Sequence, residues 1–465
     1  MIIAGGRVYT PDGPQEVDIH VEGERIARLQ PWSNPTGPNV VDANGLWVLP
    51  GAIDAHVHGR DPGFPEKETF QTLTAAAAAG GVTTVLDMPN TLPGVASREI
   101  FEAKRVAVEV KAVVDFGLWA LLRSSSTGDE VRELAAAGAT GFKAYLGYAV
   151  RRSNGQVLYS PATLDPDLEP PASYGTIARL APALRAAGRP LAVHAEDPSI
   201  LLSTMTRIET YADLLESRPD LAEGVAVAAV GELAGRLGLR LHVVHLASRA
   251  GLEALRRLRG GFAELSAETC PQYLYLSDAD YARLGPVMKM YPLVRGAADR
   301  EALVEALKAG EIDTVGSDHA PHTDDEKLHQ TLAEAHAGSP GVQTLLLSCL
   351  QLGGPEQAAR WTAENPARIF GLAAKGRLEP GKDADLVLVD PSAKTLVTPE
   401  WQRSKQRLAA LDGQEFDYAI RSVYLRGAPP AERQGRFLAP TAAASPASDA
   451  PDGRALSPRP SPNGV

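Results

Sequence analysis

Apolar and polar positions alternate with a period of two at both ends of the chain. Residues 1–49 contain such stretches at 17–21 and 25–29, and the pattern returns at 385–390 and 422–426. This period is typical of short, half-buried antiparallel strands. The two ends therefore predict one small β-sandwich domain, built from residues 1–49 together with residues 376–440.

Short apolar runs and helical segments take turns in the middle of the chain. The runs fall near residues 52–57, 82–86, 112–121, 140–146, 189–194, 239–245, 261–267 and 312–316, and helical patterns such as 173–187 and 300–308 lie between them. Repeated strand–helix units predict an α/β fold, a (β/α)8 TIM barrel over residues 50–375. A doubly wound sheet is the alternative, but no Gly-x-Gly-x-x-Gly sequence follows the first run.

Two segments show neither the hydrophobic period of a strand nor that of a helix. Residues 147–172 contain an Asn-Gly pair and several prolines, which predicts a long loop over the ends of the barrel strands. Residues 441–465 are rich in alanine, proline and serine. Such a composition predicts a disordered tail.

The composition narrows the classes of partner. The 465 residues carry a formal net charge of -11, which argues against a nucleic acid or an anionic membrane as partner. Two cysteines are too few for a disulfide framework and suit a reducing compartment. The N-terminus has neither the basic segment nor the apolar stretch of a signal peptide, and no apolar run is long enough to span a membrane. We therefore expect a cytoplasmic protein without a membrane segment.

Residues that can bind metals follow several of the apolar runs. His56 and His58 end the first run, and their spacing of two places both imidazoles on one face of a strand, with Arg60 on the same face. Other polar residues end later runs: Asn90, Lys143, His194, His245 and Asp318. Each alone is as well explained by a structural role, but a barrel places catalytic groups at these strand ends. Together they predict a metal site.

Histidine spacing selects one candidate from a neighbouring pair. His242 and His245 are three residues apart, so they face opposite sides of a strand. His245 is nearer the strand end and is the one expected to point into the barrel mouth. His20, His329 and His336 lie away from strand ends and are expected to be surface residues.

The sequence motifs resemble those of a known family. Asp-x-His-x-His-x-Arg at 54–60 is followed by Gly-Gly-Val-Thr-Thr-Val at 80–85, Met-Pro-Asn-Thr at 88–91, Gly-Ser-Asp-His-Ala-Pro-His at 316–322 and Pro-Gly-Lys-Asp-Ala-Asp at 380–385. From its first residue to about residue 430, the chain resembles the cyclic amidohydrolases of the amidohydrolase superfamily. These comprise dihydroorotase and its relatives allantoinase and dihydropyrimidinase or hydantoinase.

The resemblance implies a hydrolase with two zinc ions per chain. His56 and His58 would bind the more buried ion, and His194 and His245 the other. Lys143 matches the family's carboxylated lysine, which bridges both ions. Asp318 would bind the buried ion and transfer protons. The resemblance also implies a homodimer as the expected assembly.

Three residues match the positions that hold the substrate carboxylate in dihydroorotases, namely Arg60, Asn90 and His322. They imply a small anionic substrate and the reversible cyclisation of N-carbamoyl-L-aspartate to L-dihydroorotate in pyrimidine biosynthesis. Two departures keep the alternative open, an allantoinase or hydantoinase acting on a neutral ring: 291–295 reads Tyr-Pro-Leu-Val-Arg instead of Asn-Pro-Pro-Leu-Arg, and 268–273 is more similar to hydantoinases and allantoinases. An alternative of another class is an inactive structural homologue that partners a pyrimidine-pathway enzyme.

Overall fold

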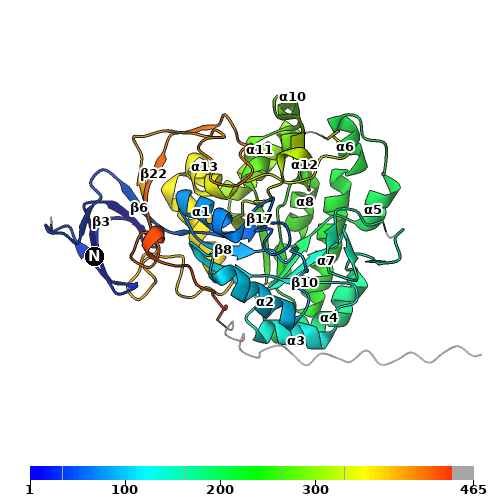
Figure 1. Cartoon of the computed structure of the whole chain (residues 1–465), viewed down its shortest axis with the longest axis horizontal. Coiled ribbons are helices and arrows are strands. Elements are labelled where there is room, and N and C mark those ends of the chain that lie inside the picture. The colour runs from blue at the N-terminus through cyan, green and yellow to red at the C-terminus, as the bar shows by residue number, and fades with distance from the viewer. Residues whose placement is uncertain (34, 163, 263, 329, 442–465) are drawn as a thin grey trace, which may run out of the picture.

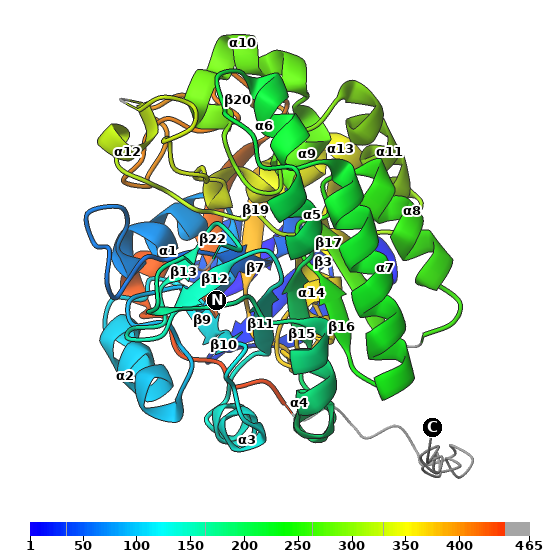
Figure 2. The same ribbon diagram turned by 90° about the vertical axis from the view of Figure 1, so that its right-hand side faces the viewer.

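A parallel barrel forms the body of the protein (Figures 1 and 2). The computed structural model describes residues 1–441 except 34, 163, 263 and 329. The barrel strands follow one another in chain order: β7 (Ala52–Val57), β8 (Val82–Asp87), β9 (Asp115–Leu118), β10 (Ala120–Leu122), β11 (Phe142–Tyr145), β15 (Leu191–His194), β16 (Leu241–Val243), β17 (Leu265–Thr269) and β18 (Thr314–Val315). Strands β7, β8 and β9 pair in parallel, as do β10, β11, β15, β16, β17 and β18. Strand β10 directly follows β9 along the chain, and a parallel bridge between Val57 and His319 closes the ring.

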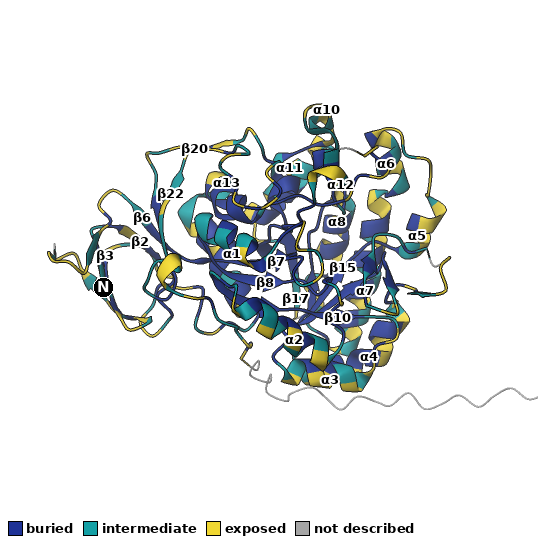
Figure 3. Cartoon of the chain, in the orientation of Figure 1, coloured by how far each residue is buried: buried dark blue, intermediate teal, exposed yellow. Residues whose placement is uncertain are grey.

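Helices surround the barrel, and the longer ones bury apolar side chains against it (Figure 3). They are α1 (Phe70–Ala79), α2 (Arg98–Glu109), α3 (Gly128–Ala136), α4 (Tyr174–Ala187), α5 (Pro198–Ser203), α6 (Tyr211–Ser217), α7 (Asp220–Leu237), α8 (Arg249–Leu258), α9 (Pro271–Tyr275), α10 (Tyr281–Leu284), α11 (Ala297–Lys308), α12 (Asp324–Leu328), α13 (Leu345–Ala359) and α14 (Asn365–Ile369). Helix α4 shows why helix ends can be predicted from the sequence. The Ser173 hydroxyl caps its first turn, and Gly188, with φ of 61°, ends it.

A smaller sheet combines strands from both ends of the chain. Its members are β1 (Ile2–Ala4), β2 (Arg7–Thr10), β3 (Gly13–Glu22), β4 (Arg25–Pro31), β5 (Val40–Asp42), β6 (Trp47–Pro50), β19 (Leu386–Asp390) and β22 (Ala419–Tyr424). Strand β19 lies between β6 and β22, so the late strands complete a sheet begun by the early ones. The α/β barrel with a small β domain from both termini is confirmed as the fold class.

The segment 147–172 is not the plain loop that its composition predicts. It forms a small antiparallel sheet in which β12 (Ala149–Arg151) lies between β13 (Val157–Leu158) and β14 (Leu168–Glu169). Strands of two or three residues are too short to show a period of two, which explains the error. Gly155 makes the turn into β13 with φ of 72°, a conformation that favours glycine.

Two further sequence predictions concern the tail and membrane-spanning segments. The predicted tail lies outside the described residues from 442 onward. Among the described helices, none is long and apolar enough to cross a membrane.

Candidate metal centre

The candidate ligands from separate barrel strands meet in one cavity at the carboxyl ends of those strands. His56 and His58 come from the end of β7, and His194 ends β15. His245 and Asp318 follow β16 and β18. These five side chains line a cavity of about 390 Å³. A barrel collects such residues there because parallel strands present their carboxyl ends on the same side.

The first half of the site consists of His56, His58 and Asp318. Oδ1 of Asp318 lies 3.1 Å from Nε2 of His58 and 3.4 Å from Nε2 of His56. One ligand atom from each residue lies within 4.8 Å of the others. Two imidazoles and a carboxylate at these separations are a ligand set suited to zinc.

The second half consists of His194 and His245, directly beside the first. Nδ1 of His194 lies 2.9 Å from Nε2 of His245. The ring of His245 is 5.2 Å from the ring of His56, centroid to centroid. Four imidazoles from three strands therefore face a common space.

Lys143, on β11, is buried, and its Nζ has no hydrogen-bond partner in the described part of the chain. Loss of hydration on burial lowers the pKa of its amine to about 7. An uncharged amine can add carbon dioxide, and the carbamate that forms is an anion that metal ions would stabilise. The lysine therefore fits the bridging role that the resemblance implies.

Burial favours the neutral form of three imidazoles of the site, those of His58, His194 and His245. Burial lowers the pKa of His58 to about 4, and it also lowers the pKa values of His194 and His245. Nδ1 of His245 is buried without a hydrogen-bond partner among the described residues. Neutral imidazoles with lone pairs facing a polar cavity are the form that binds a metal. The residues present therefore fit two zinc ions.

Acidic residues behind the histidines were missed by the sequence analysis. Oε1 of Glu268 lies 2.8 Å from Nδ1 of His56, and Oε2 of Glu196 lies 2.7 Å from Nε2 of His194. Arg218 in turn pairs with Glu196. Carboxylates in such positions fix the orientation of ligating imidazoles and increase their basicity. Glu196 follows His194 by two residues, a spacing that could have identified it.

Arg60 and His322 lie in an adjoining cavity, and Asn90 lines both cavities. Nη2 of Arg60 is 3.2 Å from Nε2 of His322, and its Nε donates to the carbonyl oxygen of Pro321 at 3.2 Å. Only 5% of Arg60 is exposed, and it forms no ion pair with a carboxylate of the described chain. Its φ of 58° is rare for an L side chain. A buried guanidinium without a carboxylate partner is suited to bind an anion.

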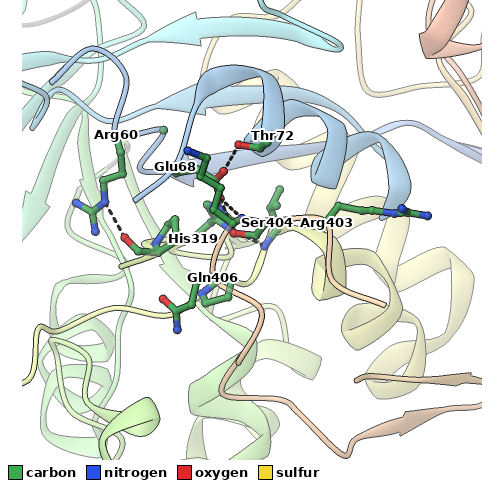
Figure 4. A network of polar contacts seen from close by, with 12 residues as sticks. Arg60, Glu68, Thr72, His319, Arg403, Ser404 and Gln406 are labelled. Carbon is green, nitrogen blue, oxygen red and sulfur yellow. Dashed lines mark hydrogen bonds and ion pairs between the residues drawn. The ribbon is translucent and has the colours of Figure 1, made fainter. Parts of the chain in front are cut away.

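A polar network fixes the motif around Arg60 to later parts of the chain (Figure 4). Glu68 accepts hydrogen bonds from Thr72 and Ser404, and its Oε2 lies 3.5 Å from Nε2 of His319. Gln406 accepts a hydrogen bond from the backbone of His322 at 2.8 Å. The segment 404–406 therefore helps to position the side of the cavity that holds Arg60.

Comparisons with known proteins agree with this geometry. The model of the amidohydrolase family matches residues 47–429. Allantoinase from Bacillus velezensis is 35% identical over 441 residues, covering 92% of this chain and 93% of that protein. Dihydroorotase from Methanosarcina acetivorans is 32% identical over 432 residues, covering 89% and 88%. L-Hydantoinase from Arthrobacter aurescens superimposes with a TM-score of 0.85 at 28% identity, covering 94% of this chain and 98% of that one.

Proposed function

The chain belongs to the amidohydrolase family and is a hydrolase of cyclic amides; from this premise we propose that it opens a small ureide ring at a binuclear zinc centre, with allantoin as the first expected substrate. The observation that carries the proposal is the convergence of four histidines and Asp318 around one cavity. Beside them, Lys143 lies on β11, the strand that pairs with the strand of His194, and its buried amine has no hydrogen-bond partner among the described residues. An inactive structural homologue would have no need to retain all of these groups.

We assign the metal ligands as the sequence indicated. His56, His58 and Asp318 would hold one zinc ion, His194 and His245 would hold the other, and Lys143, once carboxylated, would be a ligand to both. Zinc ions bound there would supply a hydroxide nucleophile near neutral pH and polarise the ring carbonyl.

The protein's own residues orient the reactants and move the proton. Asp318 is placed to accept a proton at Oδ1 and to return it to the ring nitrogen as the amide bond breaks. Its backbone φ of 50° aims the carboxylate into the cavity, and such strain is common at active sites. Tyr148 and Tyr159, beside β12 and β13, line the same cavity and restrict the space for water around the ring.

Allantoin is supported by the relatives. The allantoinase of Bacillus velezensis shares 35% identity with this chain, compared with 32% for the dihydroorotase of Methanosarcina acetivorans. The structural neighbour named above is a hydantoinase and not a dihydroorotase. These relatives support the alternative named from the sequence at least as well as its first choice, dihydroorotate.

Dihydroorotate is the second candidate because of Arg60. The guanidinium of Arg60 is buried beside the metal cavity without a carboxylate partner in the described chain. A substrate carboxylate would compensate this charge and accept hydrogen bonds from the guanidinium. Allantoin carries no carboxylate, so the two substrates differ in the group that Arg60 would bind.

A panel of four rings tests the proposal. The zinc-loaded protein is given allantoin, dihydroorotate, hydantoin and dihydrouracil, and ring opening is followed for each. We expect turnover of allantoin that disappears with Asp318→Asn. Inert allantoin with rapid turnover of dihydroorotate would replace the first candidate with the second. No turnover of any of the four by zinc-loaded protein would contradict the proposal.

A further inference from the structure

A second cluster of metal-binding side chains lies outside the centre described above. It consists of His322, Glu326 and His336, whose ligand atoms lie within 4.8 Å of one another. His322 and His336 line the adjoining cavity that also contains Arg60. We propose that this cluster is a separate site for a transition-metal ion and that the ion inhibits the enzyme when zinc is in excess.

The separations within the cluster are those of a metal site. Nδ1 of His322 lies 3.4 Å from Oε2 of Glu326, and Nδ1 of His336 lies 3.7 Å from Oε1. Ligands about 2.1 Å from a tetrahedral zinc ion are about 3.4 Å apart. A zinc ion therefore needs only a small adjustment of the exposed side chains. Two imidazoles with one carboxylate favour zinc over magnesium or calcium.

The buried member of the cluster has one ring nitrogen that is free to bind a metal. His322 is 2% exposed, and its Nδ1 has no hydrogen-bond partner among the residues that the structure describes. Its Nε2 lies 3.0 Å from the carbonyl oxygen of Ala337, which favours a proton on Nε2, and 3.2 Å from Nη2 of Arg60, which can only donate and favours a lone pair there. In the tautomer with the proton on Nε2, Nδ1 faces the carboxylate of Glu326 with a lone pair. A cation between the two atoms would remove this repulsion.

The other two ligands stand on a fixed scaffold. Glu326 lies on α12, four residues after His322, and its backbone carbonyl accepts a hydrogen bond from the backbone of His336 at 2.9 Å. Lys327 donates to the carbonyl oxygen of His336 at 2.9 Å. The backbone that carries the ligands is therefore held without the metal.

Nearby positive charges lower the affinity of the cluster for a metal ion. Nζ of Lys67 lies 2.7 Å from Oε1 of Glu326, and the guanidinium of Arg60 lies beside His322. Both charges repel a cation, and Lys67 must yield part of its contact with Glu326. The site should therefore fill only after the binuclear centre, with zinc in excess.

Occupation would act on substrate binding. The ion would fix His322 and place a positive charge at the wall of the cavity that holds Arg60 and Asn90. The inhibitory part rests on the proposed function, because it requires the substrate to reach this wall. The metal-binding part is independent of the substrate.

Zinc titration of the protein already loaded with two zinc ions tests both parts. Bound zinc is measured by equilibrium dialysis and elemental analysis, and ring opening is measured in the same samples. We expect one further zinc per chain and a loss of activity with the same midpoint. His336→Ala should raise both midpoints about tenfold or more, in line with the loss of a metal-site contact. Glu326→Gln should do the same.

His20→Ala is the matched control, because it removes an imidazole from the small sheet and should titrate like the unaltered protein. Equal uptake and equal midpoints for the unaltered protein and His336→Ala would overturn the site. A further zinc that His336→Ala loses, bound without any loss of activity, would overturn the inhibitory role. If no substrate is turned over, the proposed function is contradicted. The uptake of the further zinc ion can still be measured, so the metal site is tested independently.

Discussion

The side-chain oxygen of Asn90 lies 2.6 Å from Nδ1 of His58. This contact places the ring proton on Nδ1 and turns the lone pair of Nε2 toward Asp318, 3.1 Å away. Asn90 lines both the metal cavity and the adjoining cavity. One amide therefore links the orientation of a metal ligand to the space for substrate.

Removal of this amide should weaken metal binding. In Asn90→Ala, the imidazole of His58 loses the contact that fixes its orientation, and we expect zinc affinity to fall by about tenfold to hundredfold. Competition with a zinc chelator measures the change. Asn44→Ala removes an exposed asparagine in the small sheet domain and serves as control. Equal affinities in the two variants would show that Asn90 does not orient His58.

Carboxylation of Lys143 should depend on pH in a defined direction. Burial lowers the pKa of this amine to about 7, so the neutral form that reacts with carbon dioxide predominates above pH 7 and is lost below it. Metal-free protein given zinc at a fixed concentration of dissolved carbon dioxide should therefore regain activity about tenfold faster at pH 8 than at pH 6.

Lys143→Ala provides the matched control for this experiment. It cannot form a carbamate and should stay inactive with carbon dioxide, whereas a short carboxylic acid that fills the vacated space should restore part of the activity. Faster recovery of the unaltered protein at pH 6 than at pH 8 would contradict the assignment.

The convergence of the candidate metal ligands was predictable because their sequence signals are local. His56 and His58 are two residues apart at the end of an apolar run. Their spacing predicts that both side chains lie on one face of the strand, and the end of the run predicts that they lie at the strand's carboxyl end. Lys143 and His194 follow the same logic on β11 and β15. In a barrel, this local information suffices, since the closed ring of parallel strands brings all strand ends together.

The surroundings of the ligands were not predictable in the same way. Arg218 reaches Glu196 from the far end of α6, and no sequence period connects the two positions. Tyr148 and Tyr159 enter the cavity from the sheet of β12, β13 and β14, whose strands are too short to show alternation. His336 is exposed, as expected from the sequence, but the contact of its ring with that of His322, at 5.0 Å, had no sequence signal. These contacts depend on tertiary packing.

Arg60 should separate the two candidate substrates. Arg60→Met keeps the length of the side chain but removes the charge, so a substrate carboxylate would lose its partner. We expect kcat/KM for dihydroorotate to fall by about hundredfold or more, and that for allantoin to change little, because only the first carries a carboxylate. Arg132→Met, an exposed change on α3, is the control. Equal losses for both rings would show that Arg60 acts on the fold or the metal centre instead.

Glu223 on α7 should make stability depend on pH. Burial raises the pKa of its carboxyl from 4.5 to about 7, so the folded protein favours the protonated form. The raised pKa stabilises the folded protein fully below pH 4.5. This stabilisation is lost as the pH rises from 4.5 to about 7 and is absent above that. A pKa shift of this size corresponds to about 3 kcal/mol of folding free energy. Glu223→Gln should abolish this part of the slope, so that the variant gains stability relative to the unaltered protein at pH 8 but not at pH 4.5.

Denaturant unfolding at pH 4.5, 6 and 8 measures the effect. The side chain of Glu223 contacts the Ser248 hydroxyl and accepts a hydrogen bond from the backbone of Ala247 at 3.0 Å, and glutamine can keep both contacts through its carbonyl oxygen and amide. Glu216→Gln, at an exposed position, should leave the pH dependence of the unaltered protein intact. If Glu223→Gln and Glu216→Gln show the same slope between pH 4.5 and 8, the buried carboxyl is ionised in the folded protein across this range, and the Ser248 and Ala247 contacts stabilise the charge.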